Sequence, residues 1–181
     1  MSKKIRRINL FSGPGGGKST LSAWLFYNLK MQRKRVEQIQ EYIKFWTYIP
    51  RSPKSFDGVY IMSKQIHQED TILRGDTDLI VTDSPLMLQY FFSWHHGSPG
   101  QQPMLQLALE MESLYPSLNI LLKRKDEFYD KVGRYEDLEE AKKIDDKLKI
   151  MFDRYNVAYT EFDCTASSDI LSFVLDKVNE R

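Results

Sequence analysis

The stretch that decides the fold is Ser12-Gly13-Pro14-Gly15-Gly16-Gly17-Lys18-Ser19-Thr20. It follows a short apolar run at residues 8–11 and precedes a segment with helical periodicity. Compared with the pattern G-x-x-x-x-G-K-[ST], it departs only at the first position, where Ser12 replaces glycine. The small residues allow successive backbone N–H groups to turn inward around an anion, and the positive end of the following helix points to the same place. The stretch therefore predicts a phosphate-binding loop (P-loop) that binds a nucleoside triphosphate.

The side chains of this loop have distinct expected roles. Lys18 neutralises phosphate charge, and the hydroxyl of Ser19 joins the coordination shell of Mg²⁺. The alternative interpretation, a glycine-rich turn with a chance lysine, leaves unexplained the strand before the loop and the helix after it. We expect the nucleotide to be held by Gly13, Pro14, Gly15, Gly16, Gly17, Lys18, Ser19 and Thr20.

Composition places the chain among ordinary globular proteins. Its 181 residues fit one domain over residues 1–181, and 41% of them are hydrophobic and 28% charged. The net charge of +1 creates no overall field toward nucleic acid or membrane. The single cysteine, Cys164, rules out an internal disulfide, provides no metal cluster and is expected to be a small buried residue. No apolar run approaches the roughly 20 residues needed to span a bilayer, so we expect a cytoplasmic protein with no membrane partner.

Apolar strands alternate with amphipathic helices along the whole chain. We expect strands at residues 8–11, 36–40, 78–83, 119–122 and 157–162. The expected helices are 19–34, 60–73, 86–94, 104–115, 136–155 and 168–178. The proline- and serine-containing residues 48–58 are expected to form a loop. This alternation predicts an α/β fold, in which a parallel sheet is covered by helices on both faces and binds ligands at the carboxyl ends of its strands.

Asp83 ends the clearest interior strand of the sequence. A carboxylate at that position is suited to hold Mg²⁺ beside Ser19, or to act as the base toward an attacking hydroxyl. The alternative is an aspartate that caps the helix beginning near Pro85, and the two roles are compatible.

Glu41 follows the second expected strand, where an acceptor substrate would lie. A carboxylate there can orient or deprotonate a substrate hydroxyl, although an exposed glutamate in a charged segment is the competing interpretation. The nearby Tyr42, Phe45 and Trp46 either stack on a base of the substrate or belong to the core.

Basic residues follow the fourth expected strand. Arg124 and Arg134 flank a short segment, and guanidinium groups stabilise the charge that spreads over a phosphoryl group during transfer. We expect residues 124–135 to form a lid that excludes water from the bound nucleotide. Charged surface residues are the competing interpretation, and it applies most strongly to Lys123 and Lys125.

His95 and His96 lie in a segment rich in glycine and proline. No carboxylate or cysteine stands at ligand spacing from them, so the sequence does not predict a metal site there. A role in substrate entry is the alternative that remains open.

These motifs together resemble a family of small P-loop kinases. The resemblance rests on residues 12–20, on Thr82-Asp83-Ser84-Pro85, and on Lys123-Arg124-Lys125 leading through Gly133-Arg134 to Glu139-Glu140-Ala141. The chain is similar to the kinase domain of NadR-like nicotinamide riboside kinases and to related kinases of tailed bacteriophages. The resemblance implies a five-stranded parallel sheet of order 2-3-1-4-5, ATP with Mg²⁺ as phosphoryl donor, and an arginine-bearing lid.

The same resemblance suggests two kinds of acceptor. Some bacteriophage kinases of this group phosphorylate 5-hydroxymethyluracil within DNA, so modified DNA is a candidate beside a nucleoside-like small molecule. A phage-encoded enzyme of DNA modification would act in the host cytoplasm. The four-residue arginine motifs of other nucleoside monophosphate kinases are missing here, which leaves the acceptor undefined.

Two classes of function are compatible with this sequence. The first is a kinase (a phosphotransferase) that moves the γ-phosphoryl group of ATP to a hydroxyl of a nucleoside- or nucleotide-type acceptor. The second is a P-loop NTPase in which water is the acceptor and hydrolysis drives a partner. The chain carries its own candidate arginines, which favours the kinase.

Overall fold

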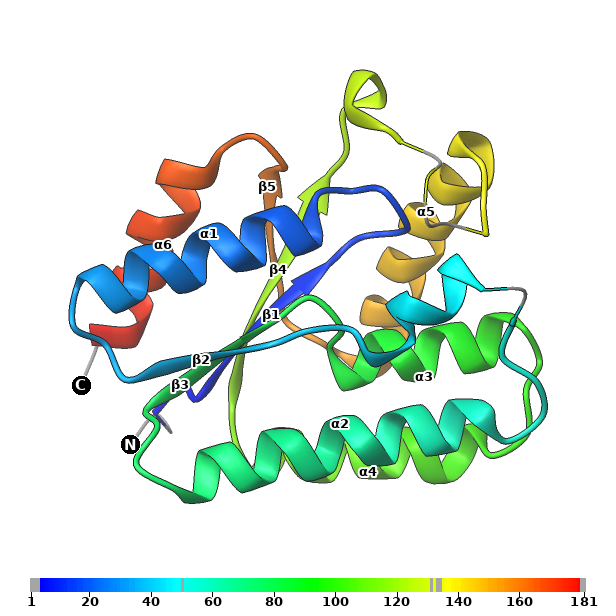
Figure 1. Ribbon diagram of the computed structural model, residues 1–181, viewed down its shortest axis with the longest axis horizontal. Coiled ribbons are helices and arrows are strands. Elements are labelled where there is room, and N and C mark those ends of the chain that lie inside the picture. The colour runs from blue at the N-terminus through cyan, green and yellow to red at the C-terminus, as the bar shows by residue number, and fades with distance from the viewer. Residues whose placement is uncertain (1–3, 50, 131, 133–134, 180–181) are drawn as a thin grey trace.

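Five parallel strands form one sheet in the order β2-β3-β1-β4-β5 (Figure 1). In this computed structural model, the described residues are 4–49, 51–130, 132 and 135–179. The P-loop follows the central strand, which pairs with β3 on one side and β4 on the other. The strands are β1 (Arg7–Phe11), β2 (Val36–Ile39), β3 (Leu79–Thr82), β4 (Ser117–Lys123) and β5 (Thr160–Asp163).

Helices cover both faces of the sheet (Figure 1). One layer consists of α1 (Lys18–Met31) and α6 (Ser167–Asn179), which contact each other. The other layer consists of α2 (Asp57–Arg74), α3 (Leu86–His95), α4 (Gln101–Leu114) and α5 (Leu138–Tyr155). Two short 3-10 helices, η1 (Tyr42–Tyr48) and η2 (Asp126–Phe128), follow β2 and β4. Within the described ranges, no helix combines the length and the hydropathy needed to cross a membrane.

The face of the sheet under α1 and α6 is apolar. Ile8 and Leu10 of β1 are fully buried there, and they belong to one cluster with Leu25 of α1 and Val174 of α6. Each such side chain contributes about 1.5–3 kcal/mol through removal from water. This packing explains why the apolar run at residues 8–11 becomes the central strand.

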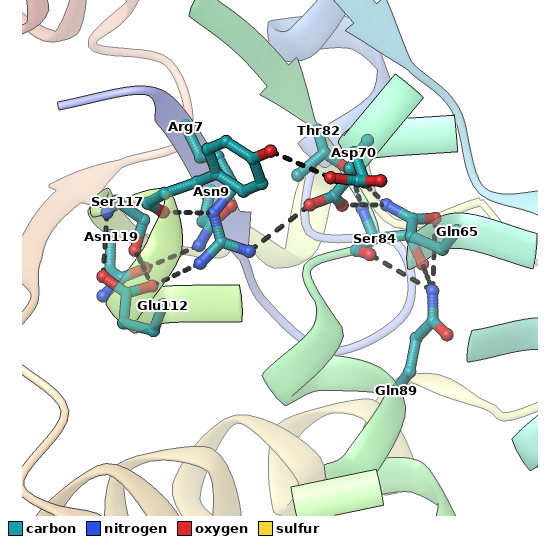
Figure 2. A network of polar contacts seen from close by, with 12 residues as sticks. Arg7, Asn9, Gln65, Asp70, Thr82, Ser84, Gln89, Glu112, Ser117 and Asn119 are labelled. Atoms are coloured by element: carbon teal, nitrogen blue, oxygen red, sulfur yellow. Dashed lines mark hydrogen bonds and ion pairs between the residues drawn. The ribbon is translucent and has the colours of Figure 1, made fainter. Parts of the chain in front are cut away.

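The opposite face carries a buried polar network near the start of β1 and β4 (Figure 2). Arg7 is only 2% exposed and forms ion pairs with Glu69 of α2 (3.3 Å) and Glu112 of α4 (2.5 Å). Gln65 of α2 donates to Glu69 (2.7 Å) and to Thr82 of β3 (3.1 Å). Removal of one partner from a buried ion pair costs about 3–5 kcal/mol, so this network fixes how α2 and α4 lie on the sheet.

The network also reaches the loop that follows β3. The side-chain amide of Gln89 in α3 donates to Gln65, and it lies within hydrogen-bond distance of the Ser84 hydroxyl (3.2 Å). Figure 2 shows Gln65, Gln89 and Ser84 converging at this point. The buried ion pair of Arg7 is thereby connected to the segment that carries Asp83.

The expected fold class and strand order are confirmed, while several element boundaries differ. The helix expected at 60–73 begins at Asp57, inside the segment expected to be a loop. The helix expected at 104–115 begins at Gln101, directly after Gly100, whose φ of +85° requires glycine. The helix expected at 136–155 begins at Leu138, because Asp137 and Glu140 form a capping box.

Candidate active site

The P-loop connects β1 to α1 at the carboxyl edge of the sheet. Gly15 and Gly17 adopt positive φ angles of 73° and 86°, a conformation that costs little only for glycine. Gly17 occupies the N-cap position of α1 and accepts a hydrogen bond from the N–H of Leu21 (3.0 Å). The unpaired N–H groups of the first turn of α1 therefore face the loop, as an anion-binding site requires.

Lys18 points into the loop and bonds to three of its oxygens. Its Nζ donates to the carbonyl of Ser12 (2.8 Å), the carbonyl of Gly13 (3.1 Å) and the hydroxyl of Ser12 (3.3 Å). Burial lowers the pKa of Lys18, while the carboxylates of Glu41 and Asp83 act in the opposite direction. Ser12, the residue that departs from the P-loop pattern, thus supplies two of the oxygens that hold this ammonium group.

Asp83 follows β3 at the same edge and is only 3% exposed. Its Oδ1 accepts a hydrogen bond from the backbone N–H of Glu41 (3.1 Å). The helix-cap alternative for Asp83 is wrong, since Pro85 is the N-cap residue of α3 and no side-chain cap bond is formed there. The aspartate instead joins the end of β3 to the segment that follows β2.

Glu41 is half-buried, so the interpretation of an exposed glutamate is also wrong. Burial raises the pKa of its carboxyl group; the charge of Lys18 opposes this shift and that of Asp83 reinforces it. A carboxylate with a raised pKa is a better proton acceptor near neutral pH than an ordinary glutamate. Lys18, Asp83 and Glu41 interact electrostatically with one another, which places the three candidate side chains in one site.

Arg124 leaves β4 and turns toward the P-loop. Its Nη1 donates to the carbonyl of Pro14 (3.0 Å), and its Nε forms an ion pair with Asp145 of α5. Its Nη2 lies 3.4 Å from the carbonyl of Ala141, also in α5. The guanidinium is therefore held between the P-loop and α5, beside the phosphate-binding backbone.

Asp145 is a site residue that the sequence analysis missed. Its Oδ1 accepts the N–H of Gly13 (2.6 Å), so one carboxylate bridges the P-loop and Arg124. The close approach explains why position 13 is glycine, since a Cβ there would lie 2.7 Å from the carbonyl of Ala141. The sequence contained a weak signal for this residue. Asp145 is four residues after Ala141 and so lies on the same side of the helix, which makes it a carboxylate on an otherwise apolar face.

The donor set fits a magnesium ion. Mg²⁺ is usually bound by one or two protein oxygens together with phosphate oxygens and water, so it needs no cluster of carboxylates. No group of three or more His, Cys, Asp or Glu in the described part of the chain is arranged to hold a metal. Ser19 lies in the first turn of α1, and the Oδ2 of Asp83 has no hydrogen bond among the described residues. Ser19 and Asp83 therefore stay the predicted ligands of such an ion.

Other predicted residues lie at the margin of the site or outside it. Lys123 pairs with Glu161 of β5 (3.2 Å), which supports its interpretation as a surface charge. Thr20 is exposed, and Cys164 is half-buried against Gly17 rather than fully buried. Arg134, with Gly133, lies outside the described residues.

The aromatic residues after Glu41 divide between core and surface. Trp46 is 7% exposed, and the guanidinium of Arg51 lies 3.4 Å from the centre of its ring. Phe45 is 72% exposed, and Tyr42 contacts Tyr60 through their hydroxyls (3.1 Å). Trp46 therefore belongs to the core, whereas stacking of a substrate base on Phe45 or Tyr42 stays a prediction.

Solved structures with the same fold include P-loop kinases. The chain aligns over 98% of its length with NadR in complex with NR (TM-score 0.76, 11% identity, 52% of that chain). It also aligns over 98% with NadR in complex with NAD and AMP-PNP (TM-score 0.72, 9% identity, 50% of that chain). The chain thus spans about half the length of these NadR chains.

A further solved structure aligns with this chain over its whole length. Thymidylate kinase from Ehrlichia chaffeensis aligns with 98% of this chain and 100% of its own (TM-score 0.66, 11% identity). At these identities the similarity shows a shared fold. No curated protein matches the sequence. A family model described as an AAA domain matches residues 7–167, which is most of the chain, and the protein therefore belongs to this AAA domain family.

Proposed function

We propose that this protein is an ATP-dependent kinase that transfers the γ-phosphoryl group to a hydroxyl of a nucleoside- or nucleotide-type acceptor, either free or within DNA. The P-loop and the fold shared with NadR and thymidylate kinase support the donor half of this proposal. The acceptor half rests on Asp83 and Glu41.

The observation that carries the proposal is the hydrogen bond between Asp83 and the N–H of Glu41 (3.1 Å). It brings a second carboxylate to the carboxyl edge of the sheet, next to the one suited to Mg²⁺. A kinase has to orient and deprotonate a substrate hydroxyl. A half-buried glutamate beside Lys18 and Asp83 suits that task.

Each of these residues has a separate role in phosphoryl transfer. Lys18 and the P-loop amides bind the β- and γ-phosphates, and Arg124 adds positive charge beside Pro14. Mg²⁺, held by Ser19 and Asp83, would neutralise charge on the phosphate oxygens. Glu41 accepts the proton of the acceptor hydroxyl, and residues 124–135, including Arg134, act as a lid that excludes water.

Transfer of label from γ-³²P-ATP tests this function. The acceptors to compare are nucleosides, nucleotides, nicotinamide riboside, and DNA with and without 5-hydroxymethyluracil. Labelled product with one class of acceptor is expected, together with slow hydrolysis in its absence. Acceptor-independent hydrolysis at about 1 per second or faster, which is the turnover of a typical kinase, would instead assign the chain to the NTPases that couple hydrolysis to a partner.

A further inference from the structure

A cavity of about 240 Å³ lies against the sheet near the beginning of β1 and β4. Its sheet side is formed by Arg7 and Asn9 of β1 and by Ser117 and Asn119, which are their register partners in β4. Figure 2 shows these four residues gathered together. We call it the Asn9 cavity. An apolar cavity of roughly 150 Å³ accommodates benzene, so the larger volume gives room for a bicyclic ring.

The Asn9 cavity is separate from the nucleotide site. Asn9 and Phe11 are two positions apart in β1, so their side chains lie on the same face of the sheet, with Phe11 nearer to the P-loop. Phe11 is fully buried, and its ring packs edge-on against Phe152 of α5 (4.9 Å between centres, 89° between planes). None of the residues that line the cavity belongs to the P-loop, and neither Glu41 nor Asp83 is among them. A ligand in this cavity would therefore bind beside the nucleotide and not in its place.

The charged groups on the sheet side of the cavity are paired with one another. Arg7 forms its ion pairs with Glu69 and Glu112, and its Nε donates to the carbonyl of Tyr115 (2.8 Å). Glu112 also accepts the N–H of Ser117 (2.8 Å) and the hydroxyl of the same residue (2.7 Å). Because two carboxylates surround one guanidinium, no positive charge remains for an anion. The cavity therefore favours a neutral ligand over a phosphate or a carboxylate.

Asn9 contributes a hydrogen-bond acceptor that lacks a donor. The residue is only 5% exposed, and its Oδ1 has no hydrogen-bond partner in the described part of the chain. Its neighbours fix the orientation of its amide: Nδ2 of Asn119 donates to the carbonyl of Ala158 (3.0 Å), so Oδ1 of Asn119 accepts from Nδ2 of Asn9 (2.9 Å). A buried carbonyl oxygen without a donor is unfavourable. A ligand with an N–H group directed at Asn9 would satisfy it.

Apolar side chains form the helix side of the Asn9 cavity. They are Leu86 and Met87 of α3, Ala108 and Leu109 of α4, and Val157, which follows α5. Leu109 is 45% exposed, so the cavity meets the solvent beside this residue. A ring that is apolar on its faces and polar at its edge matches walls of this kind.

We propose that the Asn9 cavity binds a neutral heterocycle of the size of a nucleobase, which donates an N–H hydrogen bond to Oδ1 of Asn9 and packs its ring against the apolar side chains. A nucleobase meets these requirements, because it is flat and neutral and carries N–H donors at its edge. The inference does not depend on the proposed kinase function, since it concerns a second site that the phosphoryl group does not reach.

Two probes of the same shape separate the hydrogen bond from the apolar contacts. Indole carries an N–H group, and benzofuran has an oxygen atom in its place. Each probe, and also adenine, is titrated into protein saturated with AMP-PNP and Mg²⁺, so that the nucleotide site is occupied. The side-chain amide signals of Asn9 and Asn119 should shift in NMR spectra, while that of Asn28 in α1 serves as the reference.

Indole should bind about tenfold or more tightly than benzofuran, since only indole can donate to Asn9. Adenine should shift the same two amide signals. Equal affinities of indole and benzofuran would show an apolar cavity in which Asn9 has no part. Unchanged signals with all three probes would show that the cavity holds only water. Either result would overturn the proposal.

Matched variants of α4 locate the bound probe. Leu109→Trp should fill the cavity where it meets the solvent and weaken the binding of indole and adenine about tenfold or more. Leu107→Trp is the control, because Leu107 is similarly exposed (38%) on the same helix but does not line the cavity. Equal effects of the two substitutions would place the probes elsewhere and contradict the proposal.

Asn9→Leu tests the hydrogen bond itself. The substitution keeps an apolar side chain of similar size but removes the acceptor, so the preference for indole over benzofuran should disappear. Thermal unfolding checks that the variant folds, and the two α4 variants test the site independently of it. A preference that persists in Asn9→Leu would assign the acceptor to another residue and overturn the proposal.

Discussion

The nucleotide side and the acceptor side of the site are built differently. On the nucleotide side, Lys18, Arg124 and Asp145 bond to backbone groups of the P-loop. On the acceptor side, Asp83 and Glu41 are joined by one hydrogen bond, and the aromatic Phe45 nearby is largely exposed. The side chains that bind the triphosphate are thus held in position without the nucleotide. The acceptor side has fewer such contacts, so we expect the bound acceptor to order it.

Lys18→Ala should disable the nucleotide side of the site. Loss of the ammonium group removes the main counter-charge for the transferred phosphoryl group, so label transfer should fall about 10³-fold or more. Thermal unfolding should change little, because Lys18 bonds to loop oxygens and supports no core packing. A variant that keeps most of its activity would contradict the assignment of the site.

Asp83→Asn tests the residue that belongs to both halves. We expect the rate constant for transfer to fall about 10²–10³-fold, with a smaller loss of ATP affinity, because Mg²⁺ geometry matters most in the transition state. Single-turnover kinetics together with nucleotide binding separate the two quantities. An unchanged rate constant would reduce Asp83 to a structural link between β3 and Glu41.

Glu41→Gln tests the acceptor half by itself. Transfer should fall about 10²-fold, as expected for loss of a general base, while ATP binding persists. A base works only when deprotonated, so the wild-type rate should rise with pH through the raised pKa of Glu41. The rising limb should therefore lie above the ordinary range of a glutamate and disappear in the variant. A limb that persists in Glu41→Gln would assign the base to another residue.

Asp145→Asn tests how far the nucleotide half depends on its support from α5. The variant weakens the link between Arg124 and the N–H of Gly13, so transfer should fall about tenfold, chiefly through a higher KM for ATP. Asp146→Asn is the matched control, because that neighbouring side chain is exposed. Equal behaviour of the two variants would remove Asp145 from the site.

Much of the nucleotide half could be predicted from sequence because its signals are local. Gly15 and Gly17 specify their own backbone conformations, and the apolar run at residues 8–11 indicates a buried strand by itself. Asp83 could be found because it ends a strand. Asp145 could not, since it bonds to a residue 132 positions away along the chain.

The acceptor half was harder to predict because it depends on burial. Glu41 was equally consistent with an exposed charge, and its half-burial follows from its place beside Asp83 and Lys18 in the folded chain. Helix boundaries near glycines and caps, such as Gly100 and Asp137, were displaced for a similar reason, since hydrogen bonds and not hydropathy decide them.

The P-loop, the alternation of strands and helices, and the carboxylate at the end of β3 could all be read from the amino-acid sequence. These features follow from backbone preferences and hydrophobic periodicity within short windows. Only the folded chain shows that Asp145 braces Arg124 against Gly13, that Asp83 holds the N–H of Glu41, and that Lys147 lies beside His95. Such contacts join residues distant along the chain, and their energies appear only when the sheet and its helices exclude water from the groups between them.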